Sequence, residues 1–226
     1  MIFFKSNNYY VIGKRNMDFF IEKYKVEIID GELDLNGIDI SINIGVKEIK
    51  MIAKTLKVNT TIYTLDLGWN KIKVGGAREI AKALKFNTTI RKLYLCYNDI
   101  GDNGAKALAT SLMGINTTIH VLYLEGNDIG DEGAKAIAEA LKNNTTIHTL
   151  NLRSNKFGVK GAKAIARLLR GNTTISKLNL YGNNIGVEGA KEIAEALKVN
   201  TTIHTLDLDS NSIGNDGAKA VSRALK

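Results

Sequence analysis

Residues 144–162 read NTTIHTLNLRSNKFGVKGA, and similar stretches occur five more times in this chain of 226 residues. Each stretch opens with Asn-Thr-Thr followed by Ile, and successive stretches begin 28, 29, 28, 28 and 28 residues apart. The opening asparagines are Asn59, Asn87, Asn116, Asn144, Asn172 and Asn200. A fixed period of this length is typical of solenoids, in which each repeat is one supersecondary unit. The sequence therefore predicts six stacked units over residues 59–226.

Every unit combines a strand pattern with a helix pattern. In the segment Leu-x-Leu, as at Leu178 and Leu180, the two leucines lie on one face of a short strand and the residue between them on the other. The apolar residues that follow are spaced i, i+3, i+4 and i+7, which is one stripe of an α-helix. In one unit they are Ala134, Ile137, Ala138 and Leu141. We therefore expect a helix packed behind each strand.

Stacking is required because neither element buries its apolar face alone. Parallel strands lie ~4.8 Å apart while packed helices need ~10 Å between their axes, so the stack has to curve. The predicted fold class is α/β, a solenoid with a parallel sheet inside a horseshoe arc and helices outside.

The six units resemble the leucine-rich repeat, in its long ribonuclease-inhibitor-like subtype. They are similar to the repeat region of NOD-like receptors and to stand-alone bacterial or viral repeat proteins. The motif is Ile-x-x-Leu-x-Leu-x-x-Asn-x-Ile/Phe followed by Gly-x-x-Gly-Ala, and it covers about three quarters of the chain. The resemblance implies a right-handed β-α superhelix. It also implies a ladder of inward-pointing asparagines that hydrogen-bond the backbone of adjacent turns: Asn70, Asn98, Asn127, Asn155, Asn183 and Asn211.

Both ends of the chain depart from the repeat. Residues 28–58 are predicted to form a degenerate first repeat, with Leu33 and Leu35 as its strand leucines. Residues 1–27 are rich in aromatic side chains and are predicted to be a cap over the open core or a docking segment. The regular repeats are 59–86, 87–115, 116–143, 144–171, 172–199 and 200–226. The last strand, at 205–208, is an expected open edge where Asp207 and Asp209 discourage edge-to-edge pairing.

The variable positions beside the strand leucines are expected to line the concave face. Three consecutive units place aromatic residues there, and charged residues and a further tyrosine continue the strip. Because Trp, Tyr and Arg dominate interface energetics, we interpret the strip as a protein-binding surface. Its members are Trp69, Tyr94, Tyr97, Tyr123, Glu125, Arg153, Tyr181, Asp207 and Asp209. The alternative is that neighbouring aromatic rings only stabilise the sheet, at ~0.2–1 kcal/mol a pair.

No catalytic, metal or cofactor site is predicted. His120 and His148 fall on adjacent strands, but no Cys or carboxylate pair completes a tetrahedral metal set. The single cysteine, Cys96, lies five positions beyond the histidine column, roughly 15 Å at ~3.3 Å per residue. We therefore expect a surface thiol, not a nucleophile. The chain is predicted not to be an enzyme.

Charge and hydropathy argue against nucleic-acid and membrane partners. The net charge is +8, but its lysines recur on the predicted outer helices without a groove or interleaved aromatic residues. No stretch approaches ~18 consecutive apolar residues, and the N-terminus lacks a signal-peptide pattern. A single cysteine also favours a reducing compartment. We expect a cytoplasmic protein, in the producing cell or in a host cell.

Each Asn-Thr-Thr matches the N-glycosylation sequon, but without a secretory signal we expect no modification. The expected role of the tripeptide is structural. Asparagine tolerates the left-handed conformation that ends a helix, and β-branched threonine leads into the strand.

These inferences predict a non-catalytic protein–protein interaction scaffold that binds another protein through its concave face. The Asn-, Ile- and Lys-rich composition suits an AT-rich genome and, with the resemblance, points to a host-directed effector of an intracellular microbe or virus. One alternative is a GTPase-activating regulator of the Ran activator type, from which this sequence differs by fewer repeats and no acidic C-terminal tail. Another is a structural, self-assembling repeat module. We expect a monomer, with dimerisation through the open edge as the alternative.

Overall fold

The computed structural model describes residues 28–35, 45–113 and 118–225. Its strands are β1 (Ile28–Ile29), β2 (Glu32–Asp34), β3 (Thr64–Asp66), β4 (Lys92–Tyr94), β5 (Val121–Tyr123), β6 (Thr149–Asn151), β7 (Lys177–Asn179) and β8 (Thr205–Asp207). Its helices are α2 (Val46–Leu56), α3 (Lys73–Leu84), α4 (Gly101–Leu112), α5 (Asp131–Leu141), α6 (Val159–Gly171), α7 (Gly186–Leu197) and α8 (Gly214–Ala224). The predicted cap or docking segment, 1–27, lies outside the described residues.

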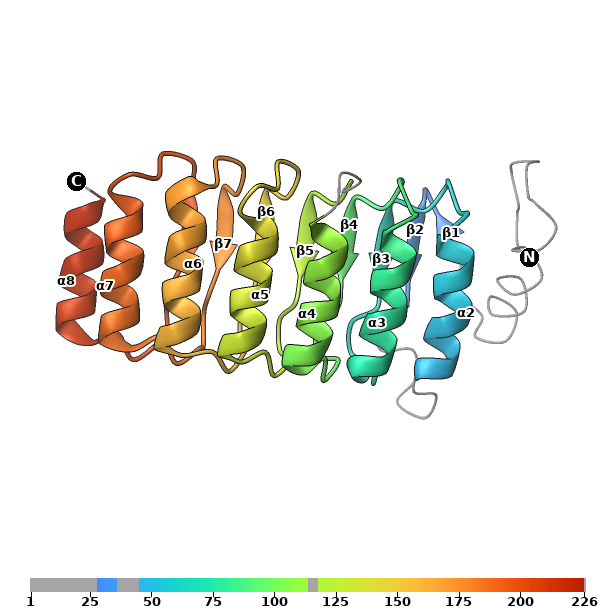
Figure 1. Cartoon of the computed structure of the whole chain (residues 1–226), viewed down its shortest axis with the longest axis horizontal. Helices are drawn as coiled ribbons and strands as arrows, with labels where there is room; N and C mark the ends of the chain where they lie inside the picture. The colour runs from blue at the N-terminus through green and yellow to red at the C-terminus, as the bar shows by residue number, and fades with distance from the viewer. Residues whose placement is uncertain (1–27, 36–44, 114–117, 226) are drawn as a thin grey trace.

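From β2 onward, strands and helices alternate along the described chain and form two layers, with the helices on one face of the sheet (Figure 1). The sheet follows chain order, with β8 at one edge. Strand β1 runs antiparallel to β2, and strands β2 to β8 are parallel. Equivalent leucines face each other across neighbouring strands, for example Leu93 and Leu122. The predicted α/β solenoid, with a parallel sheet and helices on one side of it, is confirmed.

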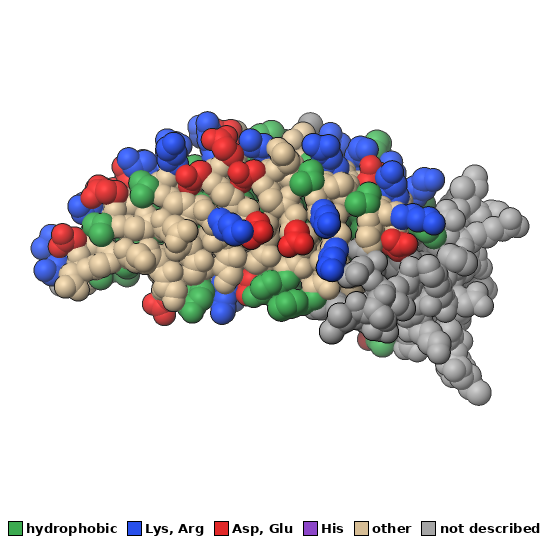
Figure 2. Space-filling view, turned by 90° about the horizontal axis from the view of Figure 1, so that it is seen from below, with side chains coloured by type: hydrophobic (Ala, Val, Ile, Leu, Met, Phe, Trp, Pro, Cys, Tyr) green, Lys and Arg blue, Asp and Glu red, His purple; other side chains and the backbone are tan. Residues whose placement is uncertain are grey.

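The stack is curved. Figure 2 shows it as an arc, with many Lys and Arg side chains along the convex edge. The curvature has the predicted physical cause, because strands pack more closely than helices do. Among the described helices, none is both long and apolar enough to cross a membrane.

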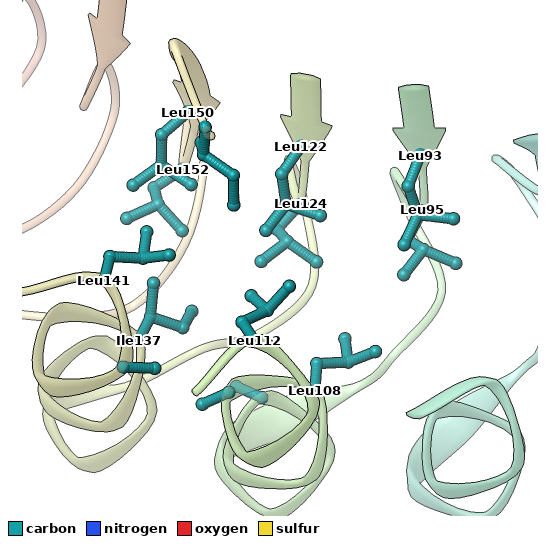
Figure 3. Close-up of a cluster of buried hydrophobic side chains, with 14 of the residues drawn as sticks. Leu93, Leu95, Leu108, Leu112, Leu122, Leu124, Ile137, Leu141, Leu150 and Leu152 are labelled. Carbon is teal, nitrogen blue, oxygen red and sulfur yellow. The ribbon is translucent and has the colours of Figure 1, made fainter. Parts of the chain in front are cut away.

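The core lies between the sheet and the helices. Leu122 and Leu124 of β5 and its exit are almost fully buried, as are Ile137 and Leu141 of α5. Figure 3 shows these leucines and isoleucine in one apolar layer between strand and helix. Small residues on the inner helix surface let neighbouring helices approach closely. A Cβ added to Gly133 would lie 3.1 Å from the Cβ of Ala105 on the previous helix.

The asparagines that follow the strands join each repeat to the one before it. Asn127 is fully buried, and its Nδ2 donates to the carbonyl oxygens of Leu95 at 2.7 Å and Glu125 at 3.0 Å. Its Oδ1 accepts from the backbone N–H of Asn98 at 3.0 Å. All six amides donate to a leucine carbonyl of the preceding repeat, namely that of Leu35, Leu67, Leu95, Leu124, Leu152 or Leu180. The Oδ1 of Asn183 is the one acceptor of this ladder that is buried without a partner.

The asparagines of Asn-Thr-Thr form a second column, which the sequence analysis did not predict. Asn172 donates from Nδ2 to the carbonyls of Leu141 at 2.9 Å and Asn144 at 3.1 Å. Its Oδ1 accepts from the N–H groups of Thr174 and Ile175. Asn87 and Asn200 repeat this arrangement.

The expected left-handed conformation of these asparagines is wrong. None of the described members of the column has a positive φ, and Asn172 has φ −84° and ψ 128°. The physical reason is that the side-chain oxygen accepts from the backbone N–H groups two and three residues later, and this turn leaves the asparagine itself extended.

Two aspartates cap the helix of the following repeat. Asp131 in α5 accepts at Oδ1 from the N–H groups of Gly158 at 2.8 Å and Gly161 at 2.7 Å, where α6 begins. Asp102 in α4 does the same for the start of α5. A carboxylate at a helix N-terminus satisfies unpaired N–H groups and complements the helix dipole.

The ladder amide at Asn127 makes a direct prediction for stability. We expect Asn127→Ala to lower the free energy of unfolding by ~1–3 kcal/mol, because it leaves buried backbone groups without partners. Urea denaturation measures the change. The matched control is Asn143→Ala at an exposed position, which should have little effect. An unchanged urea midpoint for Asn127→Ala would show that the asparagine ladder does not stabilise the fold.

Candidate protein-binding surface

The residues beside the strand leucines point away from the helices and form the concave face of the sheet. We call seven of them the concave strip: Trp69, Tyr94, Tyr97, Tyr123, Glu125, Arg153 and Tyr181. Trp69 is 61% exposed, and the other six are partly buried against neighbouring side chains. Asp207 and Asp209 lie at the β8 end of the same face.

Five members of the strip contact one another in series across five repeats. The rings of Trp69 and Tyr97 are stacked, with centroids 3.9 Å apart and an interplanar angle of 19°. The Tyr97 hydroxyl lies 2.8 Å from Oε1 of Glu125, and Arg153 Nε lies 3.3 Å from the same oxygen. The guanidinium of Arg153 lies 4.3 Å from the ring centroid of Tyr181. These five side chains therefore form one connected series across the face.

Two further tyrosines of the strip form a pair beside this series. Tyr94 and Tyr123 pack edge to face, with centroids 5.0 Å apart and an interplanar angle of 78°. They are direct neighbours in the register of β4 and β5. Edge-to-face packing is one of the two arrangements that aromatic pairs prefer.

Trp69 and Tyr97 have a left-handed backbone conformation, which is unfavourable for any residue with a side chain. The residue before each ladder asparagine has a positive φ in all six repeats: Trp69, Tyr97, Gly126, Ser154, Gly182 and Ser210. The φ is 55° at Trp69 and 53° at Tyr97. Glycine adopts this conformation without steric cost, whereas other residues lose ~1–2 kcal/mol. Since two repeats use glycine here, the fold does not require an aromatic ring.

Tyr94 and Tyr123 also occupy a position that the fold fills differently elsewhere. The equivalent residues of four other repeats are Asp66, Asn151, Asn179 and Asp207. Each accepts at Oδ1 from the N–H group two residues later, at 2.8–3.1 Å. A tyrosine cannot close this short turn. Asp207 therefore has a local structural role, while Asp209 is an exposed residue at the end of the face.

Three groups of this surface have raised pKa values. Burial raises the pKa of Tyr94 first, and the nearby Tyr123 and the charge of Asp66 add to it. The hydrogen bond to Glu125 is the main cause of the raised pKa of Tyr97. Burial, with a contribution from Glu125, raises the pKa of Cys96 to about 11.

The thiol of Cys96 is half-buried, not fully at the surface as expected. A raised pKa leaves it protonated at neutral pH, which is the opposite of what a nucleophile needs. The described residues also contain no group of three or more His, Cys, Asp or Glu side chains placed to hold a metal ion.

The paired histidines lie at the other end of the strands. The rings of His120 and His148 are 5.6 Å apart, and both Nδ1 atoms are near the carbonyl oxygen of Thr146, at 3.1 and 2.6 Å. Because a carbonyl only accepts, these contacts assign the proton to Nδ1 in both rings. The two histidines therefore hold the backbone at Thr146 by hydrogen bonds, which is a structural role.

One residue that supports the strip was missed from the sequence. Gly126 has φ +64°, and a Cβ placed on it would lie 2.4 Å from the ring of Tyr97. The absence of a side chain at Gly126 thus lets the Tyr97 ring lie flat beside Trp69. The signal was present, because Gly126 immediately follows Glu125 in the column that holds Trp69 and Tyr97.

We expect Gly126→Ala to displace Tyr97 and break its stack with Trp69. Gly182→Ala is the matched control, because Gly182 has φ +66° but its added Cβ would come no closer than 3.4 Å to a neighbour, the Oγ of Ser154. Both variants should lose ~1–2 kcal/mol of stability from the left-handed backbone. Trp69 is the only tryptophan, so its fluorescence and near-ultraviolet circular dichroism report the stack. Identical indole signals in the two variants would contradict this geometry.

Comparisons with known proteins place this geometry in a family. A family model described as "Leucine Rich repeat" matches residues 58–81, 86–109, 116–138, 143–166, 171–194 and 199–222. Curated proteins give no significant match. Solved structures also match, and two of them are described next.

The first, "Leiomodin-1 Actin-Binding Site 2 (ABS2)", is 24% identical over 80% of this chain and 87% of its own, with a TM-score of 0.46. The second, the tropomodulin C-terminal domain of Caenorhabditis elegans, is 18% identical over 66% of this chain and 90% of its own, with a TM-score of 0.52. The tropomodulin domain shares the fold. The six matched repeats show that this chain belongs to the leucine-rich repeat family.

Proposed function

We propose that this protein is a non-catalytic scaffold that binds another protein through its concave strip. The observation that carries this proposal is the left-handed backbone of Trp69 and Tyr97. Two adjacent repeats hold large rings where glycine suits the fold better. Interface energetics supply a reason to retain them, since Trp and Tyr are enriched among the residues that dominate binding.

The composition of the concave face supports a binding role. The strip combines rigid aromatic rings with charged groups held by defined contacts, such as Arg153 between Glu125 and Tyr181. Rigid side chains lose little conformational entropy on binding. A surface of this kind is suited to a protein partner.

One observation supports a non-catalytic role. The raised pKa of Cys96 disfavours the thiolate form that a cysteine nucleophile needs. We propose that the protein acts as a monomer in a cytoplasm, its own or that of a host cell, with a host-directed role. The 28-residue period supports the ribonuclease-inhibitor-like subtype.

Affinity capture from a host-cell lysate tests the concave strip. The baits are the wild-type protein and the variant Trp69→Ala/Tyr94→Ala/Tyr123→Ala, compared by mass spectrometry. We expect the triple variant to lose selectively at least one protein that the wild type captures. Removing three interface aromatic residues should weaken such a complex by at least about 100-fold.

Phe86→Ala is the matched control, because Phe86 is an exposed aromatic residue, 63% accessible, outside the strip. It should capture the same proteins as the wild type. Circular dichroism and melting temperature establish that every bait is folded. If the folded triple variant and the wild type capture the same proteins, the concave strip is not the binding surface.

A further inference from the structure

We propose that the partner presents an extended segment rich in lysine and arginine to the concave strip. This inference deepens the proposed function and rests on it. The proposed function leaves the chemistry of the partner open, and this inference specifies it.

The charge of the concave face is opposite in sign to that of the chain. The outward-facing positions of the described strands and their exits carry six carboxylates: Glu32, Asp34, Asp66, Glu125, Asp207 and Asp209. The same positions carry three basic residues: Lys92, Arg153 and Lys177. The whole chain has a net charge of +8. The excess of positive charge therefore lies elsewhere, and Figure 2 shows Lys and Arg along the convex edge.

The aromatic rings of the strip suit a cationic side chain. One face of the Trp69 ring stacks on Tyr97, and the indole remains 61% exposed. A lysine or arginine over an exposed indole is attracted by the negative face of the ring. Arg153 already shows this geometry on the same face, with its guanidinium 4.3 Å from the centroid of Tyr181.

The raised pKa values of two partly buried groups agree with a negative potential at the centre of this face. After burial, nearby acidic groups contribute to the raised pKa of Tyr94, among them Asp66 and Glu32. Glu125 and Asp66 likewise contribute to the raised pKa of Cys96. A negative potential disfavours further negative charge and favours an incoming cation.

The dimensions of the face set the length of the segment. From β3, which precedes Trp69, to β8, which precedes Asp209, there are five inter-strand spacings. At ~4.8 Å each, they cover about 24 Å. An extended chain advances ~3.4 Å per residue, so about seven residues cross the face. A segment of this length reaches both the aromatic rings and the carboxylates of the last repeat.

Selection from a display library of random linear peptides tests the inference. The full-length protein is the bait, and each enriched peptide is then measured against the Trp69→Ala/Tyr94→Ala/Tyr123→Ala variant by fluorescence anisotropy. We expect enriched peptides to carry an excess of Lys and Arg, to weaken at higher salt, and to lose at least about ten-fold in affinity against the triple variant.

A pair of single variants in one repeat isolates the charge. Asp209→Asn removes an exposed carboxylate on the concave face, and Asp216→Asn removes one on α8, on the other face of the same repeat. Both change the net charge by the same amount. We expect Asp209→Asn to weaken peptide binding about two- to five-fold and Asp216→Asn to leave it unchanged. Equal effects would show non-specific attraction and contradict the site.

The other outcomes separate this inference from the proposed function. Peptides that depend on the strip but lack basic residues would overturn the cationic segment and leave the concave strip as the binding surface. Peptides that bind the triple variant equally well would overturn both. The absence of any enriched peptide would contradict a linear segment, while affinity capture still tests the strip.

A second copy of this chain is the competing occupant, because its convex edge is basic. Sedimentation velocity of the protein alone distinguishes the two. We expect a monomer at low and high salt. Salt-sensitive association that the triple variant abolishes would assign the concave strip to self-assembly and overturn the cationic segment.

Discussion

After each of the strands β3 to β8, a buried asparagine amide joins its repeat to the one before it, and this contact sets the register of the solenoid. Its Nδ2 donates to a leucine carbonyl of the preceding repeat, as Asn127 does to Leu95. That carbonyl lies just past the end of its strand, and leaving it buried without a partner would cost ~1–3 kcal/mol. Because every repeat must place this amide against its neighbour, the units stay in a register of about 28 residues.

The same constraint determines what the concave face can display. Turning each asparagine inward puts the preceding residue in the left-handed conformation, in all six repeats. Glycine suits this position, yet Trp69 and Tyr97 occupy it in adjacent repeats. Tyr94 and Tyr123 similarly stand where four other repeats use Asp or Asn to close a local turn. The interior thus repeats the same asparagine contacts in every regular repeat. On the concave face, these aromatic residues stand where the fold is better served by Gly, Asp or Asn.

The periodic parts of the structure could be predicted from the sequence because each repeat pairs its leucines with the same residues of the next. Strand, helix and curvature all follow from that period. Side-chain contacts could not be predicted in the same way. The stack of Trp69 on Tyr97 depends on a left-handed backbone and on the missing side chain of Gly126, and neither is visible in a periodic pattern. The left-handed conformation predicted for Asn172 is wrong because its side chain forms hydrogen bonds with two parts of the backbone. Its Nδ2 donates to the carbonyl of Leu141, and its Oδ1 accepts from the N–H of Thr174.

If the aromatic rings of the strip serve binding and not folding, replacing Trp69 by glycine should leave the fold nearly as stable. Urea denaturation of Trp69→Gly, followed by circular dichroism, measures the free energy of unfolding and tests this. Loss of the ring stack, ~0.5–1.5 kcal/mol, is offset by relief of the left-handed strain, ~1–2 kcal/mol. We predict that the free energy of unfolding changes by less than about 1 kcal/mol. A loss of more than about 2 kcal/mol would show that the indole is part of what holds the solenoid together, and would contradict the claim.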